Sequence, residues 1–501
     1  MATEDYANVP PQWESSRRSP LVPLLNRTDA LADLDALLGR AKRGDGHTAF
    51  LLGEPGSGKS ALVRAMLERI RQEDIIYGVT RAYEGDDAIP FAPWVTLARQ
   101  LDTLRDTLPG PGRVSDRPSG DAVAIGRRIA NLLRDISQSR PLVLVFEDVG
   151  NADESSLIAL RTVAQQASDC RILLVVTLDT AGESSSAVES WMTQVVRESQ
   201  TWQITLRPVR TAVINSFVRT RYPALDPVEL ERIVSDLERL SGGNALFLSE
   251  LLTVLGVSTP GASALGERLR DLPASLSAAV DQRAARLSPR ALQTLRVAAV
   301  VGNAIDVDLI CEIRSVDQDE LIEDLEEAID QGLLIDDPYG LRFRHGVFRE
   351  GLIDQQSHLR RRRLHAEIAR LLRTRPATRA ADVAFHAERA GDLAAACEGY
   401  ERAAETALAA HALPEAIRCL RRALSLAESA ELSPERQDEL RLALADSLKW
   451  TNVTAAEQEV ARVLTRARIR GDALTLARAR QCEAVLLYEV GERNARLAIL
   501  E

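Results

Sequence analysis

One short stretch of this sequence has the residue types and the spacing of a phosphate-binding loop. Gly53-Glu-Pro-Gly-Ser-Gly-Lys-Ser60 fits the pattern G-x-x-x-x-G-K-[ST], with an apolar run before it and a helical pattern after it. In such a loop the backbone N–H groups surround the phosphates, and the following helix adds its positive end. The candidate nucleotide-contacting residues here are Gly53, Gly56, Ser57, Gly58, Lys59 and Ser60. Lys59 would reach the β- and γ-phosphates of ATP or ADP, and Ser60 would bind Mg²⁺.

An acidic pair ends a second apolar run. Leu142–Phe146 reads as a buried strand, and Glu147 and Asp148 follow it directly. Carboxylates in this place can hold Mg²⁺, directly or through water, and one of them can orient a water molecule for attack on a phosphate. Glu147 and Asp148 are therefore candidate catalytic residues and metal ligands. The alternative is an exposed strand end that happens to be acidic.

The elements that would position these residues alternate between strand and helix. Four short apolar runs, separated by helical patterns, lie at His47–Leu52, Ile75–Thr80, Leu142–Phe146 and Ile172–Thr177. This alternation predicts a parallel sheet covered by helices, as in a P-loop NTPase.

The second half of the chain is almost entirely helical in pattern. Helical stretches between 274 and 331, followed by two apolar runs around Asp336-Asp-Pro-Tyr-Gly340, predict a winged-helix-like domain. Towards the C-terminus, Ala416, Ala456 and Ala495 recur about 40 residues apart, which is typical of tetratricopeptide-like helix pairs. The alternative is a plain helical bundle. The array stops inside a helix pair without a capping helix, so we expect it to continue beyond Glu501.

Composition narrows the classes of partner. Of 62 basic residues only Lys42, Lys59 and Lys449 are lysines, and the net charge is −11, which argues against a surface that binds nucleic acid or anionic membranes as a whole. The five cysteines have no C-x-x-C spacing, and no apolar leader or membrane-spanning run is present. We therefore expect reduced thiols and a cytoplasmic protein. The run Arg360–Arg363 lies in a helical pattern and reads as a solvated face.

Together these stretches resemble the STAND class of P-loop ATPases. The sequence is similar to the ATPase, winged-helix and tetratricopeptide-like portion of large ATP-binding LuxR-type transcriptional regulators, from about Leu21 onward. The resemblance rests on four stretches besides the Gly-rich loop: Arg81–Pro93, Glu147–Ser155, Ser241-Gly-Gly-Asn-Ala-Leu-Phe-Leu248 and Phe343-Arg-His345. It implies a helical lid whose Ala245 region lies near the adenine, and a winged-helix His345 that touches the β-phosphate of ADP. Without the resemblance, a lone histidine there reads as a buried or surface residue.

Several positions depart from the family pattern. Gly150 and Asn151 replace His-Trp after the acidic pair, Leu178 stands where relatives place an arginine, and Ala245 replaces the lid proline. These departures lead us to expect that nucleotide binding is kept while hydrolysis is slow or absent.

The sequence thus predicts a multidomain α/β plus all-α protein. We expect a disordered N-terminus (1–22), a P-loop ATPase core (23–200), a helical lid (201–256), a linker (257–272), a winged-helix-like arm (273–375) and a tetratricopeptide-like α-solenoid (376–501). The resemblance implies an ATP/ADP-controlled signalling switch that self-assembles, takes a small-molecule or protein inducer on its repeats, and reaches DNA only through a module outside this chain. The alternatives are an active ATP hydrolase that remodels partners and a pseudo-ATPase scaffold that binds protein.

Overall fold

The computed structural model describes most of the chain between Arg27 and Leu500. The described residues are 27–83, 89–101, 122–180, 186–223, 225–255, 276–302, 304–337, 340–344, 346–375 and 379–500. The predicted disordered N-terminus, the predicted linker at 257–272 and His345 lie outside them.

The chain divides into two compact units, each built from separate stretches of sequence. The first comprises Met1–Asp33, Leu52–Glu68 and Thr205–Ile368, and the second comprises Leu34–Leu51, Arg69–Ile204 and Ala369–Glu501. The phosphate-binding loop therefore groups with the lid and the winged helix, and the acidic pair groups with the helical repeats.

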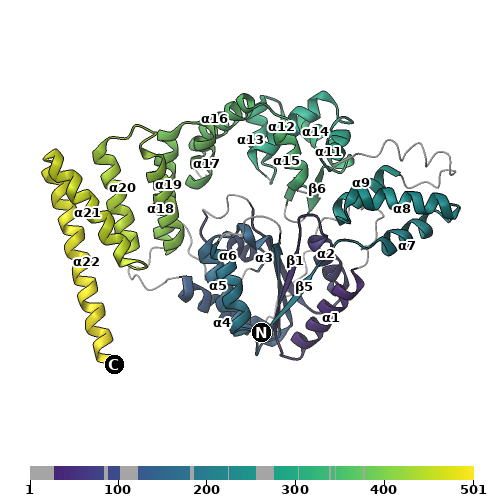
Figure 1. Ribbon diagram of the computed structural model, residues 1–501, viewed down its shortest axis with the longest axis horizontal. Coiled ribbons are helices and arrows are strands. Elements are labelled where there is room, and N and C mark those ends of the chain that lie inside the picture. Colours follow the sequence, from purple (N-terminus) through teal and green to yellow (C-terminus); the bar gives the residue numbers. More distant parts are fainter. Residues whose placement is uncertain are drawn as a thin grey trace, which may run out of the picture. The chain divides into compact units, whose positions relative to one another are not determined.

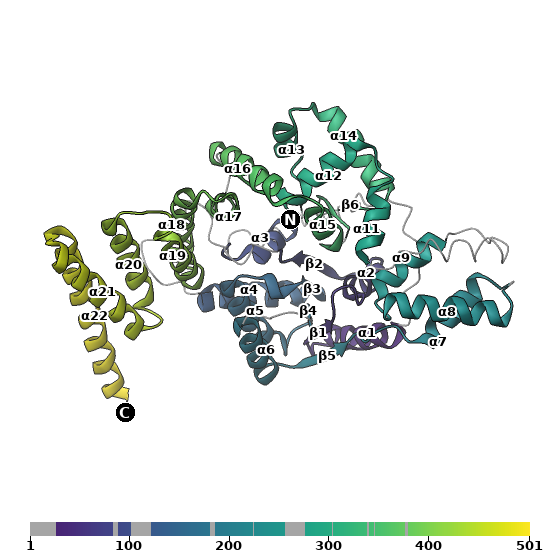
Figure 2. The same ribbon diagram turned by 45° about the horizontal axis from the view of Figure 1, so that its top comes forward.

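A five-stranded sheet forms the centre of the α/β part, with the strand order β2-β3-β4-β1-β5 (Figure 2). The strands are β1 (His47–Gly53), β2 (Ile76–Arg81), β3 (Leu142–Glu147), β4 (Ile172–Asp179) and β5 (Thr201–Thr205). β2, β3 and β4 are parallel, and β3 is buried along its apolar length, as the uninterrupted apolar run predicts. The four predicted strands are confirmed, but β5 was missed.

Several helices of the α/β part contact the sheet, among them those that begin at Ala92, Ala122 and Glu154. The helices of this part are α1 (Thr28–Lys42), α2 (Lys59–Ile70), α3 (Ala92–Gln100), α4 (Ala122–Ser139), the 3₁₀ turn η4 (Val149–Asn151), α5 (Glu154–Ala167) and α6 (Ser186–Glu198). In α4, for example, Ile125, Ile129 and Leu133 recur at helical spacing and are buried.

The lid consists of three helices with an apolar core of their own. They are α7 (Thr211–Arg221), α8 (Pro227–Ser241) and α9 (Ala245–Leu255). Val218, Leu237 and Leu251 lie at the centre of this core, and Asp226 begins α8 with a capping box.

The winged-helix-like domain combines a helical group with a two-stranded wing. Its elements are α11 (Leu276–Ala284), α12 (Pro289–Val301), α13 (Val307–Arg314), α14 (Gln318–Asp330), the antiparallel strands β6 (Leu334–Asp337) and β7 (Gly340–Phe343), and α15 (Gly346–Asp354). The predicted hairpin is confirmed.

The C-terminal helices stack as successive antiparallel pairs, which confirms the predicted α-solenoid (Figures 1 and 2). After α16 (His358–Thr374), they are α17 (Ala380–Ala390), α18 (Leu393–Ala409), α19 (Leu413–Ala427), α20 (Pro434–Leu448), α21 (Val453–Arg470) and α22 (Ala473–Leu500). Ala416 and Ala456 occupy the same position near the starts of α19 and α21, and both are fully buried. None of the described helices is long and apolar enough to cross a membrane.

Candidate functional site

The phosphate-binding loop runs from the end of β1 into α2. Gly56 and Gly58 have positive φ angles of 79° and 100°, which residues with a Cβ rarely adopt. A Cβ at Gly56 would lie 2.7 Å from Oδ1 of Asn244, and a Cβ at Gly53 would lie 2.6 Å from Oγ of Ser57. The glycines are therefore required both by the backbone conformation and by the space in the loop.

Lys59 lies at the first position of α2 and bends back over its own loop. Its Nζ donates hydrogen bonds to the carbonyl oxygens of Gly53 (2.9 Å) and Glu54 (3.1 Å), and the residue is only 6% exposed. The hydroxyl of Ser57 is buried without a hydrogen-bond partner among the described residues. A positive charge held over a glycine-lined loop, beside an unsatisfied hydroxyl, fits the phosphates of a nucleotide.

Arg27, just before α1, supports the loop from a distant part of the sequence. Its guanidinium donates to the carbonyl oxygens of Ser57 (2.7 Å) and Arg207 (2.8 Å), so it joins the loop to the segment that leads into the lid. Burial lowers the pKa of Arg27. The sequence analysis missed this residue, because a single arginine before a helix carries no pattern.

The lid binds the phosphate-binding loop through the start of α9. Asn244 donates from Nδ2 to the carbonyl oxygen of Pro55 (2.9 Å), and the N–H of Leu246 donates to the carbonyl oxygen of Gly56 (2.9 Å). Oδ1 of Asn244 also accepts from the N–H groups of Leu246 and Phe247, so that this side chain caps α9. Asn244 thus links the first turn of the lid helix to the loop.

Ala245, the first residue of α9, lies close to the same loop. Its Cβ lies 3.8 Å from the position that a Cβ would take on Gly58. The sequence analysis selected Ala245 but overlooked its neighbour Asn244, although Asn is a preferred residue for capping a helix.

Replacing Asn244 with alanine is expected to weaken nucleotide binding by about tenfold, because the loop loses one direct hydrogen bond to the lid. Loss of the cap should also reduce the free energy of unfolding by about 1 kcal/mol. Asn452→Ala is the matched control, since Asn452 caps α21 without touching the loop. Calorimetric titration with ADP checks the prediction, and equal ADP affinities for the two variants would contradict it.

The acidic pair lies at the end of β3 and is bound by an arginine. The register of β2 and β3 places Arg81 opposite Glu147, and its guanidinium lies 2.8 Å from the carboxylate of Glu147 and 3.2 Å from that of Asp148. Burial alone would lower the pKa of Arg81, but the attraction of both carboxylates outweighs burial and raises it. The N–H of Asp148 donates to the hydroxyl of Thr177 (2.8 Å), a fully buried residue of β4. The sequence analysis missed both Arg81 and Thr177 as members of this group.

This donor set only partly suits a metal ion. Two adjacent carboxylates are suitable ligands for Mg²⁺, but Arg81 already pairs with both of them and offsets one of their two charges. The described residues contain no group of three or more His, Cys, Asp or Glu side chains arranged to hold a metal. A metal ion at Glu147 and Asp148 would therefore have to replace the guanidinium.

Three of the positions that depart from the family pattern carry no phosphate-sensing charge. Gly150 and Asn151 belong to the 3₁₀ turn η4, and Leu178 is buried near the end of β4. At the end of β4, an apolar side chain thus takes the place of the expected arginine.

His345 lies outside the described residues, but its neighbour Arg344 belongs to a charged cluster. Glu250 of α9 forms an ion pair with Arg283 of α11, and burial raises the pKa of Glu250 despite Arg283 and Arg344. Burial lowers the pKa of Arg344, and repulsion from Arg283 and from Arg64 of α2 lowers it further. Within the first unit, these charges connect α2, the lid and the winged-helix-like domain.

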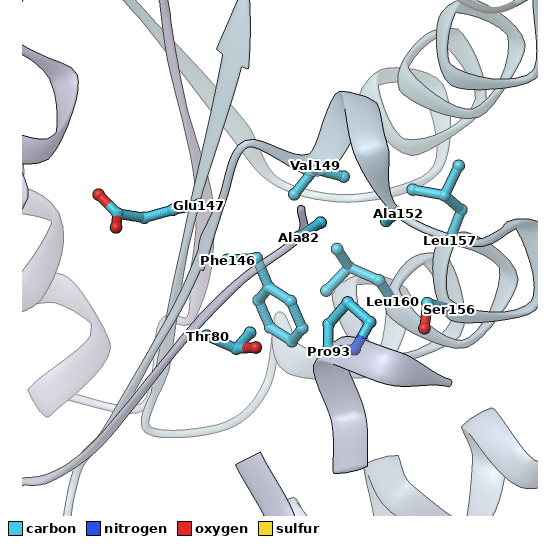
Figure 3. Close-up of a pocket in the computed structure, with 10 residues that line it drawn as sticks. All are labelled: Thr80, Ala82, Pro93, Phe146, Glu147, Val149, Ala152, Ser156, Leu157 and Leu160. Atoms are coloured by element: carbon cyan, nitrogen blue, oxygen red, sulfur yellow. The ribbon is translucent and has the colours of Figure 1, made fainter. Parts of the chain in front are cut away.

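A small pocket lies behind the acidic strand end (Figure 3). It is lined mostly by apolar side chains, including Phe146, Leu157 and Leu160, and the carboxylate of Glu147 points away from them. This pocket has the wrong polarity for a nucleotide phosphate.

In α16, Arg360, Arg362 and Arg363 are exposed while Ile368 is buried, in agreement with a solvated face.

The α/β part is similar to a known protein family. Residues 23–176 match the family model of the AAA ATPase domain. No curated protein sequence matches the chain.

Several solved structures are similar at low sequence identity. A STAND protein with a tetratricopeptide repeat sensor from Pyrococcus horikoshii is 13% identical (TM-score 0.44), over 91% of this chain and 67% of that chain. The ORC2 protein of Aeropyrum pernix, solved in ADPNP-ADP complexes, is 14% identical (TM-score 0.37), over 72% and 98%. The Cdc6p protein of Pyrobaculum aerophilum is 17% identical (TM-score 0.35), over 68% and 98%.

Proposed function

We propose that this protein is a signal-transduction switch that binds ATP or ADP and changes its conformation with the nucleotide. The observation that carries the proposal is the direct bonding of the lid to the phosphate-binding loop, through Asn244 to Pro55 and through Leu246 to Gly56. Because these carbonyl groups belong to the loop itself, a change in the loop's conformation alters the bonds that hold α9. The site thus connects nucleotide occupancy to the lid.

The chain's own residues have distinct roles in binding. The glycines allow backbone N–H groups to face the phosphates, and Lys59 exchanges its two carbonyl partners for phosphate oxygens. Arg27 holds the carbonyl side of the loop in place. His345 stays a proposed contact of the β-phosphate, next to the cationic Arg344.

Bound Mg²⁺ would neutralise phosphate charge in such a site. Ser60, Glu147 and Asp148 stay the proposed ligands of Mg²⁺, and a carboxylate of the acidic pair could bind the ion only when Arg81 has released it. Glu147 and Asp148 are also the candidates for orienting a water molecule, but only when they are free of the guanidinium.

We expect slow hydrolysis, because Mg²⁺ and the attacking water would have to compete with Arg81 for the acidic pair. The acidic pair is occupied by Arg81 and no cationic side chain stands at Leu178, so the charges that normally promote attack on the γ-phosphate are engaged or absent there. We expect turnover below about 0.01 s⁻¹, which is typical of unassisted switch proteins. A phosphate-release assay checks this value.

Two other outcomes of that assay would change the proposal. Turnover above about 1 s⁻¹ that is lost in Lys59→Ala would indicate an active hydrolase. Copurified nucleotide that never exchanges with added ATP would instead indicate a scaffold with a structural nucleotide. Failure to bind either ADP or ATP in calorimetry would refute the switch.

We further propose that the switch is of the transcriptional-regulator type and acts in the cytoplasm. The solenoid of α17–α22 offers the surface for a small-molecule or protein inducer, and self-assembly would follow ATP binding. Contact with DNA would belong to a separate module. Light scattering with ATP, with ADP and without nucleotide tests the self-assembly.

A further inference from the structure

One side chain of the helical repeats is inserted into the α/β part of the second unit. Glu415, in the first turn of α19, accepts hydrogen bonds from the N–H of Ser155 (2.9 Å) and from its hydroxyl (2.6 Å). The residue is only 1% exposed. Glu415 is distant from α5 in the sequence. It thus accepts from an N–H group at the start of α5 that has no acceptor within its own helix.

A second buried carboxyl group lies at the same turn. Asp153 caps α5, and its Oδ1 accepts from the N–H groups of Ser156 (2.8 Å) and Phe91 (2.9 Å). Its Oδ2 is buried with no hydrogen-bond donor among the described residues, and the residue is 0% exposed. An ionised carboxylate with one unsatisfied oxygen is unfavourable in such a place.

The surrounding charges do not neutralise both carboxyl groups. On α19, Arg418 attracts Glu415. On α5, Glu154 adds a further acid but is exposed. The N–H of Phe91, the N-cap of α3, and the indole N–H of Trp94 in α3 bond to this turn and carry no charge, while the charged Arg99 of α3 is exposed near the other end of that helix. Burial, and then the charge of Glu415, raise the pKa of Asp153 from 3.8 to about 7, and burial also raises the pKa of Glu415. Two buried acids with one nearby cation cannot both ionise at low cost.

We propose that Asp153 and Glu415 form a pH-sensitive clasp that holds the helical repeats on the α/β part, and that this clasp tightens when it takes up one proton from solvent and loosens when it releases it. The clasp begins five residues after Asp148 in the sequence. The inference goes beyond the proposed function, because the clasp contains no nucleotide-binding residue.

The direction of the pH effect follows from the shift of Asp153. Its pKa is raised in the closed form, so closure binds a proton and is favoured at low pH. The stabilisation of the closed form by this proton is fully present below pH 3.8, the ordinary pKa, and is lost as the pH rises through about 7. Between pH 5 and pH 8 the closure equilibrium should weaken by at most about 100-fold, and the full factor applies only if Asp153 regains its ordinary pKa when the clasp opens.

Hydrogen exchange at the N–H of Ser155 tests the clasp, because Glu415 is its acceptor. In the full chain, resolved by mass spectrometry and corrected for intrinsic exchange, protection should fall from pH 5 to pH 8. Asp153→Asn imitates the protonated acid and should keep Ser155 protected at pH 8. Glu154→Gln is the matched control on the same turn and should behave like the wild type.

Three results decide whether the clasp responds to pH as proposed. Protection of Ser155 that does not change between pH 5 and pH 8, or a pH dependence in Asp153→Asn equal to that of the wild type, would overturn the proposal. If Asp153→Asn does not fold by circular dichroism, Glu415→Gln serves instead, since it removes the charge that helps to raise the pKa of Asp153 and should also flatten the profile. Lys59→Ala should keep the wild-type profile, which separates failure of the clasp from failure of nucleotide binding.

Discussion

Lys59→Ala is expected to lower the affinity for ATP and ADP by about 100-fold, because it removes the cation that the loop positions for the phosphates. The ammonium group is buried and already bound to two loop carbonyls, so little ordering remains to be done when phosphate oxygens replace them. Calorimetric titration with each nucleotide measures the loss.

The chain offers unusually clean controls for this substitution, because it has only two other lysines. Lys449 forms an ion pair with Asp446 on the surface of the solenoid, and Lys42 pairs with Glu73. Lys449→Ala and Lys42→Ala should bind nucleotide like the wild type. Wild-type affinity in Lys59→Ala would mean that the glycine-rich loop is not a phosphate site.

Asp324→Ala is expected to reduce the free energy of unfolding by about 3 kcal/mol, the largest loss of stability among these substitutions. The carboxylate is only 1% exposed and accepts from Arg290 (2.7 Å), from Thr294 (2.6 Å) and from Arg314 (3.2 Å). Its removal leaves buried donors of α12 and α13 without their acceptor, and these helices build the winged-helix-like domain.

The adjacent acid provides the control. Glu323 also pairs with Arg290 but is 69% exposed, so Glu323→Ala should leave stability nearly unchanged. Urea unfolding followed by circular dichroism compares the two variants. Equal midpoints would show that the buried network contributes no more than a surface ion pair.

Sequence patterns sufficed for the parts of the fold that depend on local periodicity. Apolar runs identified four of the five strands, and Gly53–Ser60 identified the phosphate-binding loop with its flanking strand and helix. β5 escaped because it lies at the edge of the sheet and exposes most of its residues, including Trp202. An edge strand of this kind has no apolar run to recognise.

The residues that bond to the site residues could not be predicted from local sequence patterns. Arg27, Asn244 and Arg81 each act across a long stretch of sequence, and their effect depends on which strands and turns become neighbours. Glu415 illustrates the difficulty most clearly. An acid in the first turn of a helix normally stabilises the helix dipole from the surface, whereas this one is buried against another helix.

The bonds between Asn244, Leu246 and the phosphate-binding loop also impose a reciprocal relation between two ligands. If nucleotide binding changes the stability of the first turn of α9, then any molecule that stabilises that turn must change the nucleotide affinity by the same factor. Couplings of this kind typically amount to about 1–3 kcal/mol, or roughly 5- to 150-fold in affinity. A compound that binds only to the lid could therefore regulate the site without contacting a phosphate.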